Sequence, residues 1–152
     1  MEKYPGEEVN YMTDKPVLQF IDTNIFIYAY DCSSPEKQRK AKELVLNLWE
    51  NQNGCISVQV LQEFYVNIVY KVPVPLPVKE ALMIITDLSC WYLHTPSASD
   101  VIETINIQQN YRISFWDAMI INSAKKMGCN ILWTEDLNEE QVIEGVIIKN
   151  PF

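Results

Sequence analysis

The stretch that decides the fold is Val17-Leu18-Gln19-Phe20-Ile21-Asp22-Thr23-Asn24-Ile25. Its first five residues form a mostly apolar run that predicts a buried strand, and Asp22 ends that run. Because Asp, Thr and Asn are good helix caps, the run 25–30 is predicted to form a helix directly after the strand. Capping alone is one interpretation of Asp22. The other is a role in chemistry, since parallel α/β sheets bind their ligands outside the carboxyl ends of the strands.

Short apolar runs alternate with helical patterns along the rest of the chain. Strands are predicted at 17–21, 55–57, 91–93, 131–133 and 146–148. Helices are predicted at 35–51, 58–70, 78–88, 98–110 and 114–127. This alternation implies βα units and a mostly parallel sheet with helices on both faces. The simplest organisation of the 152 residues is a flexible N-terminal arm at 1–15 and a single domain at 16–152.

The overall charge is acidic, with 20 acidic and 12 basic residues and a net charge of −8. This balance argues against broad affinity for a nucleic-acid backbone. It does not exclude an enzyme that acts on nucleic acid, because metal ions can neutralise part of an acidic site. The basic groups at 37–42 and 125–126 are interpreted as solvated helix faces.

The cysteines, glycines and histidine disfavour several kinds of site. The four cysteines lie too far apart for a CxxC motif, and Cys55, Cys90 and Cys129 are expected to be buried free thiols. The four glycines form neither a Walker A loop nor a dinucleotide fingerprint, so no nucleotide cofactor is expected. The single histidine, His94, makes a histidine-based zinc site or a Ser-His-Asp triad improbable, and we expect it to have a structural or surface role.

The expected location of the protein follows from two absent patterns. No apolar core of a signal peptide follows the charged N-terminus. No stretch approaches the roughly 20 apolar residues that a membrane-spanning helix needs. We therefore expect a cytoplasmic protein that does not contact a membrane.

Asp117 is the acidic residue that solvation explains least well. In a helix that starts at Ser114, Asp117 shares its face with Ile120, Ile121 and Ala124, while Asn122, Lys125 and Lys126 occupy the other side. The alternative is a capping box, in which the Asp117 carboxylate bonds back to the backbone of Ser114.

Glu63 and Asp136 carry weaker signals. Glu63 lies nearly opposite the apolar stripe of its helix, which fits either a solvated residue or the wall of a wet cleft. Asp136 follows the predicted strand at 131–133, at the same edge of the sheet as Asp22. Asn138 with Gln141 predicts the cap of a further helix, which leaves Asp136 without a capping role.

Convergence of these acidic residues would need compensation. Close carboxylates repel each other by about 4 kcal/mol per pair at an effective dielectric constant near 20. Either some pKa values rise or hard divalent cations bind, and Mg²⁺ and Mn²⁺ prefer oxygen ligands. The hypothesis from the residues is thus an acidic pocket that binds metal.

With these motifs together, the chain resembles the PIN-domain family, which includes VapC-type, toxin-like ribonucleases of prokaryotes. The resemblance runs from about Val17 to Phe152 and rests on Phe20-Ile21-Asp22-Thr23-Asn24, Ser57 with Glu63, Trp116-Asp117-Ala118 through Ala124 and Gly128, Leu132-Trp133-Thr134-Glu135-Asp136-Leu137, and Asn150-Pro151-Phe152. It implies a three-layer α/β/α sandwich around a five-stranded parallel sheet. It also implies that an acidic quartet binds one or two Mg²⁺ or Mn²⁺ ions, namely Asp22, Glu63, Asp117 and Asp136, with Asn24 and Thr134 as accessory polar groups.

The function that the resemblance implies is metal-dependent hydrolysis of RNA by an endoribonuclease. The toxin-like branch further implies an antitoxin protein as partner, and a homodimer is a further expectation. Two alternatives stay open: a non-catalytic module that binds RNA or protein, and a phosphatase or phosphotransferase with Asp22 as nucleophile. Asn24 counts against the phosphatase, whose best-known pattern has a second aspartate at that position.

Overall fold

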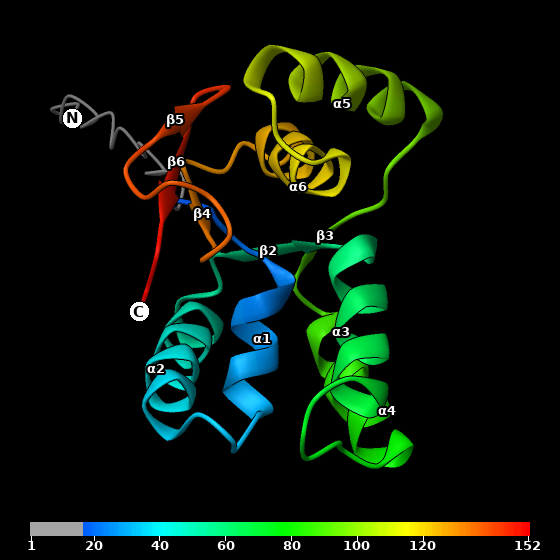
Figure 1. Ribbon diagram of the computed structural model, residues 1–152, viewed down its shortest axis with the longest axis vertical. Coiled ribbons are helices and arrows are strands. Elements are labelled where there is room, and N and C mark those ends of the chain that lie inside the picture. Colours follow the sequence, from blue (N-terminus) through cyan, green and yellow to red (C-terminus); the bar gives the residue numbers. More distant parts are fainter. Residues whose placement is uncertain (1–16) are drawn as a thin grey trace, which may run out of the picture.

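The computed structural model describes residues 17–152, so the arm expected at 1–15 lies outside the described residues. The chain forms three layers, with helices α1 to α4 on one side of a central sheet and α5 and α6 on the other (Figure 1). The helices are α1 (Thr23–Tyr30), α2 (Pro35–Asn51), α3 (Val58–Tyr70), α4 (Val78–Leu88), α5 (Ala98–Tyr111) and α6 (Phe115–Lys126). The expected α/β/α class is therefore confirmed.

The sheet has the strand order β3-β2-β1-β4-β6-β5. Its strands are β1 (Gln19–Ile21), β2 (Gly54–Ser57), β3 (Tyr92–His94), β4 (Ile131–Trp133), β5 (Val142–Ile143) and β6 (Val146–Lys149). The pairs from β3 to β6 are all parallel, as expected for five strands. The count of five was incomplete, because β5 adds a sixth, antiparallel strand at the edge.

Strand β5 stands where the cap signal at Asn138 predicted a helix, and that prediction was wrong. A two-residue turn joins β5 to β6, with positive φ angles of 52° at Glu144 and 81° at Gly145. Such a turn matches the right-handed twist of paired strands, and glycine accepts the left-handed conformation without steric cost. A hairpin with β6 therefore pairs the backbone of Val142 and Ile143 in place of a helix.

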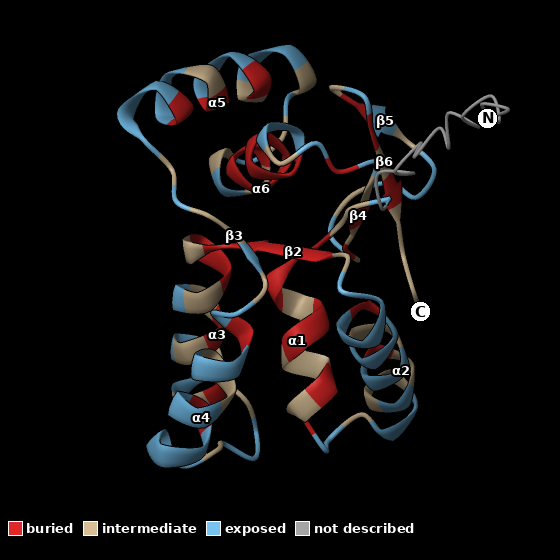
Figure 2. Ribbon diagram, turned by 180° about the vertical axis from the view of Figure 1, so that it is seen from behind, coloured by how far each residue is buried: buried red, intermediate tan, exposed pale blue. Residues whose placement is uncertain are grey.

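The register of the sheet brings the carboxyl ends of its parallel strands together. Ile21 is paired with Trp133, and Ser57 with His94, so the carboxyl ends of the parallel strands lie side by side. The residues that anchor this register are completely buried, among them Phe20, Ile56 and Leu132. Figure 2 shows this buried centre, with β2, much of α1 and the middle of α6 in red and the outer faces of α2 and α4 exposed.

Two expectations about single residues need correction. Cys55 and Cys129 are buried free thiols as expected, but Cys90 is exposed, because it lies in the turn after α4 and not within a strand. Val17 is 50% exposed and β1 begins two residues later, at Gln19.

In the described part of the chain, no helix combines the length and the apolar character that crossing a membrane requires.

Candidate metal centre

Asp22 is both a helix cap and a buried carboxylate at the edge of the sheet. It is the N-cap of α1, and its Oδ1 accepts a hydrogen bond from the backbone N–H of Thr23 at 2.7 Å. Its Oδ2 accepts a second hydrogen bond from the hydroxyl of Thr134 at 2.9 Å. The side chain is thus held between β1 and β4, and only 6% of the residue is exposed. Capping alone does not explain this carboxylate, since its Oδ2 binds Thr134, the residue after β4, and not the backbone of α1.

Asp117 lies in the first turn of α6, after the N-cap Ser114. The backbone N–H of Asp117 donates to the Ser114 hydroxyl at 3.1 Å, which is one half of a capping box. Within residues 17–152, the reciprocal bond from the Ser114 backbone to the Asp117 carboxylate is not formed. The carboxylate is therefore not needed for capping and is available to the cleft.

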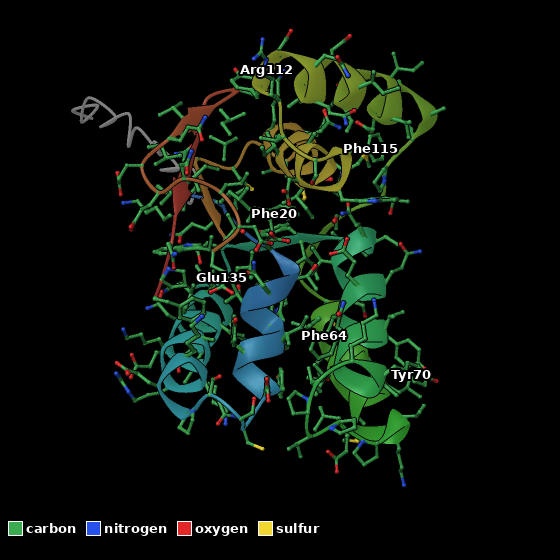
Figure 3. The ribbon with its side chains drawn as sticks, viewed as in Figure 1. Phe20, Phe64, Tyr70, Arg112, Phe115 and Glu135 are labelled. Carbon is green, nitrogen blue, oxygen red and sulfur yellow. The ribbon has the colours of Figure 1, made fainter. Side chains whose placement is uncertain are left out.

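Asp136 is placed by its neighbours in the loop after β4. Its backbone N–H donates to the hydroxyl of Thr134 at 3.1 Å. The preceding residue, Glu135, accepts hydrogen bonds from Tyr28 at 2.7 Å and from Lys37 at 2.9 Å. Figure 3 labels Glu135, which lies close to α1 and α2. These contacts tie the loop to two helices and hold Asp136 next to the end of β1.

These three aspartates converge. Asp22, Asp117 and Asp136 each offer a carboxylate oxygen, and the three oxygens lie within 4.8 Å of one another. They line one cleft of about 220 Å³, together with Asn24, Gln59, Trp116 and other residues of α1, α3 and α6. Carboxylate oxygens are the ligands that a hard divalent cation such as Mg²⁺ prefers, so the three aspartates form a candidate cation site.

Glu63, the expected fourth member of the quartet, lines the same cleft but lies outside this group of three. Its Oε2 accepts a hydrogen bond from the Thr23 hydroxyl at 2.7 Å, and its Oε1 accepts one from Gln59 Nε2 at 2.8 Å. Both oxygens are thus bound to protein donors. The predicted stripe on α3 was also misplaced, because the buried face is formed by Val60, Phe64 and Ile68, and Glu63 lies beside this face and not opposite it.

Gln59 is a site residue that the sequence reasoning missed. Its amide Nε2 donates both to Glu63 and, at 3.3 Å, to the backbone carbonyl of Trp116. It therefore joins α3 to the start of α6 across the cleft. Its position four residues before Glu63, on the same side of the helix, was the available signal. Thr23 was quoted within a motif but was not given a role, although its hydroxyl holds Glu63.

The electrostatics of the cleft favour protonation of the aspartates. Burial raises the pKa of Asp22 to about 7, although the hydrogen bonds from Thr134 and Thr23 favour the charged form. Burial also raises the pKa of Asp117 and of Asp136, and repulsion from nearby carboxylates adds to both shifts. A bound cation would relieve this repulsion.

One orphaned atom supports the fit of a cation to this cleft. Asn24 lines it, and its buried Oδ1 has no hydrogen-bond partner in the part of the chain that the structure describes. Its Nδ2 contacts the Thr134 hydroxyl at 3.4 Å. A buried carbonyl oxygen without a donor is costly unless a water or an ion satisfies it. Asn24 thus lines the cleft, whereas Thr134 is completely buried behind it and contacts Asp22 and the backbone of Asp136.

His94, the last residue of β3, belongs to a separate hydrogen-bond network with residues of α5 and α6. Its Nδ1 lies 2.8 Å from the Ser123 hydroxyl, and its Nε2 lies 3.4 Å from Asp100 Oδ2. Asp100 Oδ1 also accepts a hydrogen bond from Asn122, which is completely buried and not on the solvated side of α6 as predicted. Although a Ser-His-Asp contact exists, Ser123 is completely buried, so no substrate can reach it, and the network has a structural role.

A larger cavity of about 410 Å³ lies at the end of α2, beside β2 and β3. Its walls are largely aromatic, formed by Trp49, Trp91 and Tyr92 with Gly54 and Cys90 among the others. None of the acidic residues considered above lines it. The smaller, acidic cleft is therefore the better candidate for chemistry, despite its size.

Comparison with known proteins defines the class. The family model of the PIN domain matches residues 20–143, which is most of the chain, and the chain belongs to the PIN-domain family. No curated protein sequence matches the chain significantly.

Solved structures with the same fold include three relevant examples. A toxin–antitoxin complex from Klebsiella pneumoniae is 24% identical with a TM-score of 0.65, and the match covers 88% of this chain and 98% of that chain. VapBC2 from Rickettsia felis, bound to a DNA fragment from its promoter, is 20% identical with a TM-score of 0.63 and the same coverage. VapC20 from Mycobacterium tuberculosis, a toxin that cleaves the sarcin-ricin loop, is 15% identical with a TM-score of 0.58, covering 75% of this chain and 86% of that chain.

Proposed function

We propose that this protein is a metal-dependent endoribonuclease that hydrolyses RNA phosphodiester bonds and acts as the toxin of a toxin–antitoxin pair. The observation that carries the proposal is the convergence of Asp22, Asp117 and Asp136, whose carboxylate oxygens lie within 4.8 Å of one another in an open cleft. Membership of the PIN-domain family and the similarity to VapC20 support the nuclease chemistry.

In this proposal, Asp22, Asp117 and Asp136 hold Mg²⁺ or Mn²⁺, as one ion or two. When bound, the metal supplies an activated water and stabilises negative charge on the phosphate. When ionised, these carboxylates would offset the positive charge of the ion. The preference for Mg²⁺ and Mn²⁺ rests on the all-oxygen ligand set.

The surrounding residues orient these groups. Thr134 donates to Asp22 and accepts from the backbone of Asp136, so one hydroxyl sets the positions of two aspartates. Glu63 lies outside the group of three. We assign it to the attacking water, which it would orient and from which it would accept a proton as the water bonds to phosphorus. The bond from phosphorus to the leaving oxygen would break in the same displacement, and the leaving oxygen would take up a proton from solvent.

The partners in this proposal are an RNA substrate, an antitoxin protein and a second copy of the chain in a homodimer. The antitoxin is supported by similar structures solved as toxin–antitoxin complexes, among them the one from Klebsiella pneumoniae. An antitoxin would restrain the nuclease in the cytoplasm, where its RNA substrate would be found.

The test is incubation of purified protein with end-labelled RNA and Mg²⁺ or Mn²⁺. We expect cleavage that is lost with a chelator and lost in Asp22→Asn. Asp87→Asn is the matched control, because Asp87 is exposed on α4, away from the cleft, and should cleave like the wild type. Equal cleavage by Asp22→Asn would reject the proposed site.

If no RNA is cut, calorimetric titration with Mn²⁺ distinguishes the remaining possibility. Failure to bind millimolar Mn²⁺ would favour the non-catalytic module. Binding that is lost in Asp117→Asn would keep the metal centre and point to an RNA target outside the set tried.

A further inference from the structure

Trp116 is the exposed residue of the cleft that the proposed chemistry does not use. It lines the cleft, immediately before Asp117 in the first turn of α6, and 63% of the residue is exposed. By contrast, the residues that follow Asp117, from Ala118 to Ala124, are all buried. Burial of an indole releases a large free energy, and an exposed indole does not gain most of it. Core packing therefore does not explain the position of Trp116.

The backbone that carries this indole is held in place. Its carbonyl accepts a hydrogen bond from Gln59 Nε2 at 3.3 Å, which ties it to α3 on the other side of the cleft. The ring of Phe115 packs edge to face against the indole, with centroids 5.1 Å apart and planes at 82°. Phe115 is labelled at the start of α6 in Figure 3. The backbone of Trp116 is therefore fixed at the cleft, and Phe115 supports the exposed indole.

The charge of the protein limits the ways in which it can bind a nucleic acid. The net charge is −8, and the cleft itself is acidic. Several lysines form salt bridges with the protein's own carboxylates, as in Lys37 with Glu135, Lys125 with Glu144 and Lys126 with Glu103. We therefore expect contacts with phosphates, which usually supply most of the affinity, to contribute less here. Base stacking does not depend on charge and contributes about 1–3 kcal/mol per base.

We infer that the Trp116 indole stacks on an unpaired base next to the phosphate that reacts in the cleft. This inference rests on the proposed function, because it takes the acidic cleft as the place of cleavage. A duplex keeps both faces of its bases stacked within the helix and cannot offer one to the indole.

The kinetic experiment compares cleavage of a short single-stranded RNA by Trp116→Ala, Trp116→Phe and the wild type. We expect Trp116→Ala to raise KM about tenfold with little change in kcat, and Trp116→Phe to have a smaller effect. Tyr70→Ala is the matched control, because Tyr70 is 67% exposed at the far end of α3 and its loss should change neither parameter (Figure 3).

A change in the RNA gives the decisive comparison. An RNA with an abasic nucleotide beside the cleavage position should raise KM for the wild type as much as Trp116→Ala does. The same RNA should add nothing further in Trp116→Ala, because the two changes remove the same contact. Fully additive effects, or an unchanged KM in Trp116→Ala, would overturn the inference while leaving the nuclease in place.

A binding measurement keeps the inference testable without cleavage. In Asp22→Asn protein, single-stranded RNA should quench tryptophan fluorescence, and the added Trp116→Phe change should remove that quenching. If the wild type cuts none of the RNAs tried, quenching that depends on Trp116 would still support stacking. Quenching that persists in Trp116→Phe would reject it.

Discussion

The Thr134 hydroxyl donates a hydrogen bond of 2.9 Å to Asp22 Oδ2, and it joins two residues that are 112 positions apart in the sequence. Both residues are buried, at the carboxyl ends of the adjacent strands β4 and β1. The bond favours the charged form of Asp22, in opposition to the burial that raises its pKa to about 7. This one contact therefore links the register of the sheet to the charge of Asp22, the proposed cation ligand.

Replacement of Thr134 by valine should weaken metal binding. Thr134→Val keeps the volume but removes the donor to Asp22, so the pKa of Asp22 should rise further and its orientation should be lost. We expect the affinity for Mn²⁺ to fall about tenfold, as is usual for a residue that orients a metal ligand. Calorimetric titration at pH 7 measures the change. Thr134→Ser retains the hydroxyl and should bind Mn²⁺ like the wild type; equal affinity for all three proteins would contradict the prediction.

The metal-free protein should become more stable when Asp22 is neutralised, and the gain should depend on pH. Burial raises the pKa of Asp22 from 3.8 to about 7, so between these values the folded state binds more protons than the unfolded state. The contribution of the protonated carboxyl to stability is complete below about pH 4 and is lost as the pH rises towards 7.

Asp22→Asn should therefore melt close to the wild type near pH 4 and roughly 5 °C or more above it near pH 8, in the presence of a chelator. Thermal melts across this range measure the difference. Addition of Mn²⁺ should stabilise the wild type and leave Asp22→Asn unchanged. A difference in melting temperature that stays constant with pH would show that Asp22 does not titrate as described.

Glu63 and Asp117 should differ in their importance for the metal. The Asp117 carboxylate belongs to the group of three within 4.8 Å, whereas Glu63 stands outside it with both oxygens bound to Thr23 and Gln59. We expect Asp117→Asn to lower the affinity for Mn²⁺ by about a hundredfold and Glu63→Gln to lower it by no more than about threefold. Cleavage should be lost in both, because Glu63 is assigned to the water. Equal losses of affinity for Mn²⁺ would show that Glu63 also binds the metal.

Gly54 should be intolerant of any side chain because of Trp91. A Cβ atom at Gly54 would overlap the indole ring of Trp91, which packs directly on the backbone of β2. Gly54→Ala should reduce the free energy of unfolding by about 1–3 kcal/mol, as overpacking usually does. Urea unfolding measures this loss. In the double variant Gly54→Ala/Trp91→Leu the cost of the added methyl group should largely disappear, so strictly additive losses would argue against the overlap.

The sequence by itself determined most of the features that depend on residues close together along the chain. The apolar run before Asp22, the alternation of strand and helix patterns, and the cap at Ser114 follow from local burial and local hydrogen bonds. Five parallel strands and two helical layers were predictable for this reason. The positions of Asp22 and Asp136 after their strands were predictable too, because a parallel sheet places the carboxyl ends of its strands together.

The tertiary structure decided the features that depend on which distant residue a side chain or a backbone group contacts. Glu63 forms hydrogen bonds with Thr23 and Gln59 and lies outside the group of three aspartates. Its place in the sequence motif had suggested a fourth metal ligand. Asn122 is buried because Asp100, on α5, accepts its hydrogen bond, and β5 forms because β6 offers it a hairpin partner. Such contacts join residues from different elements, and periodicity within one element cannot reveal which partner a side chain or a backbone group will choose.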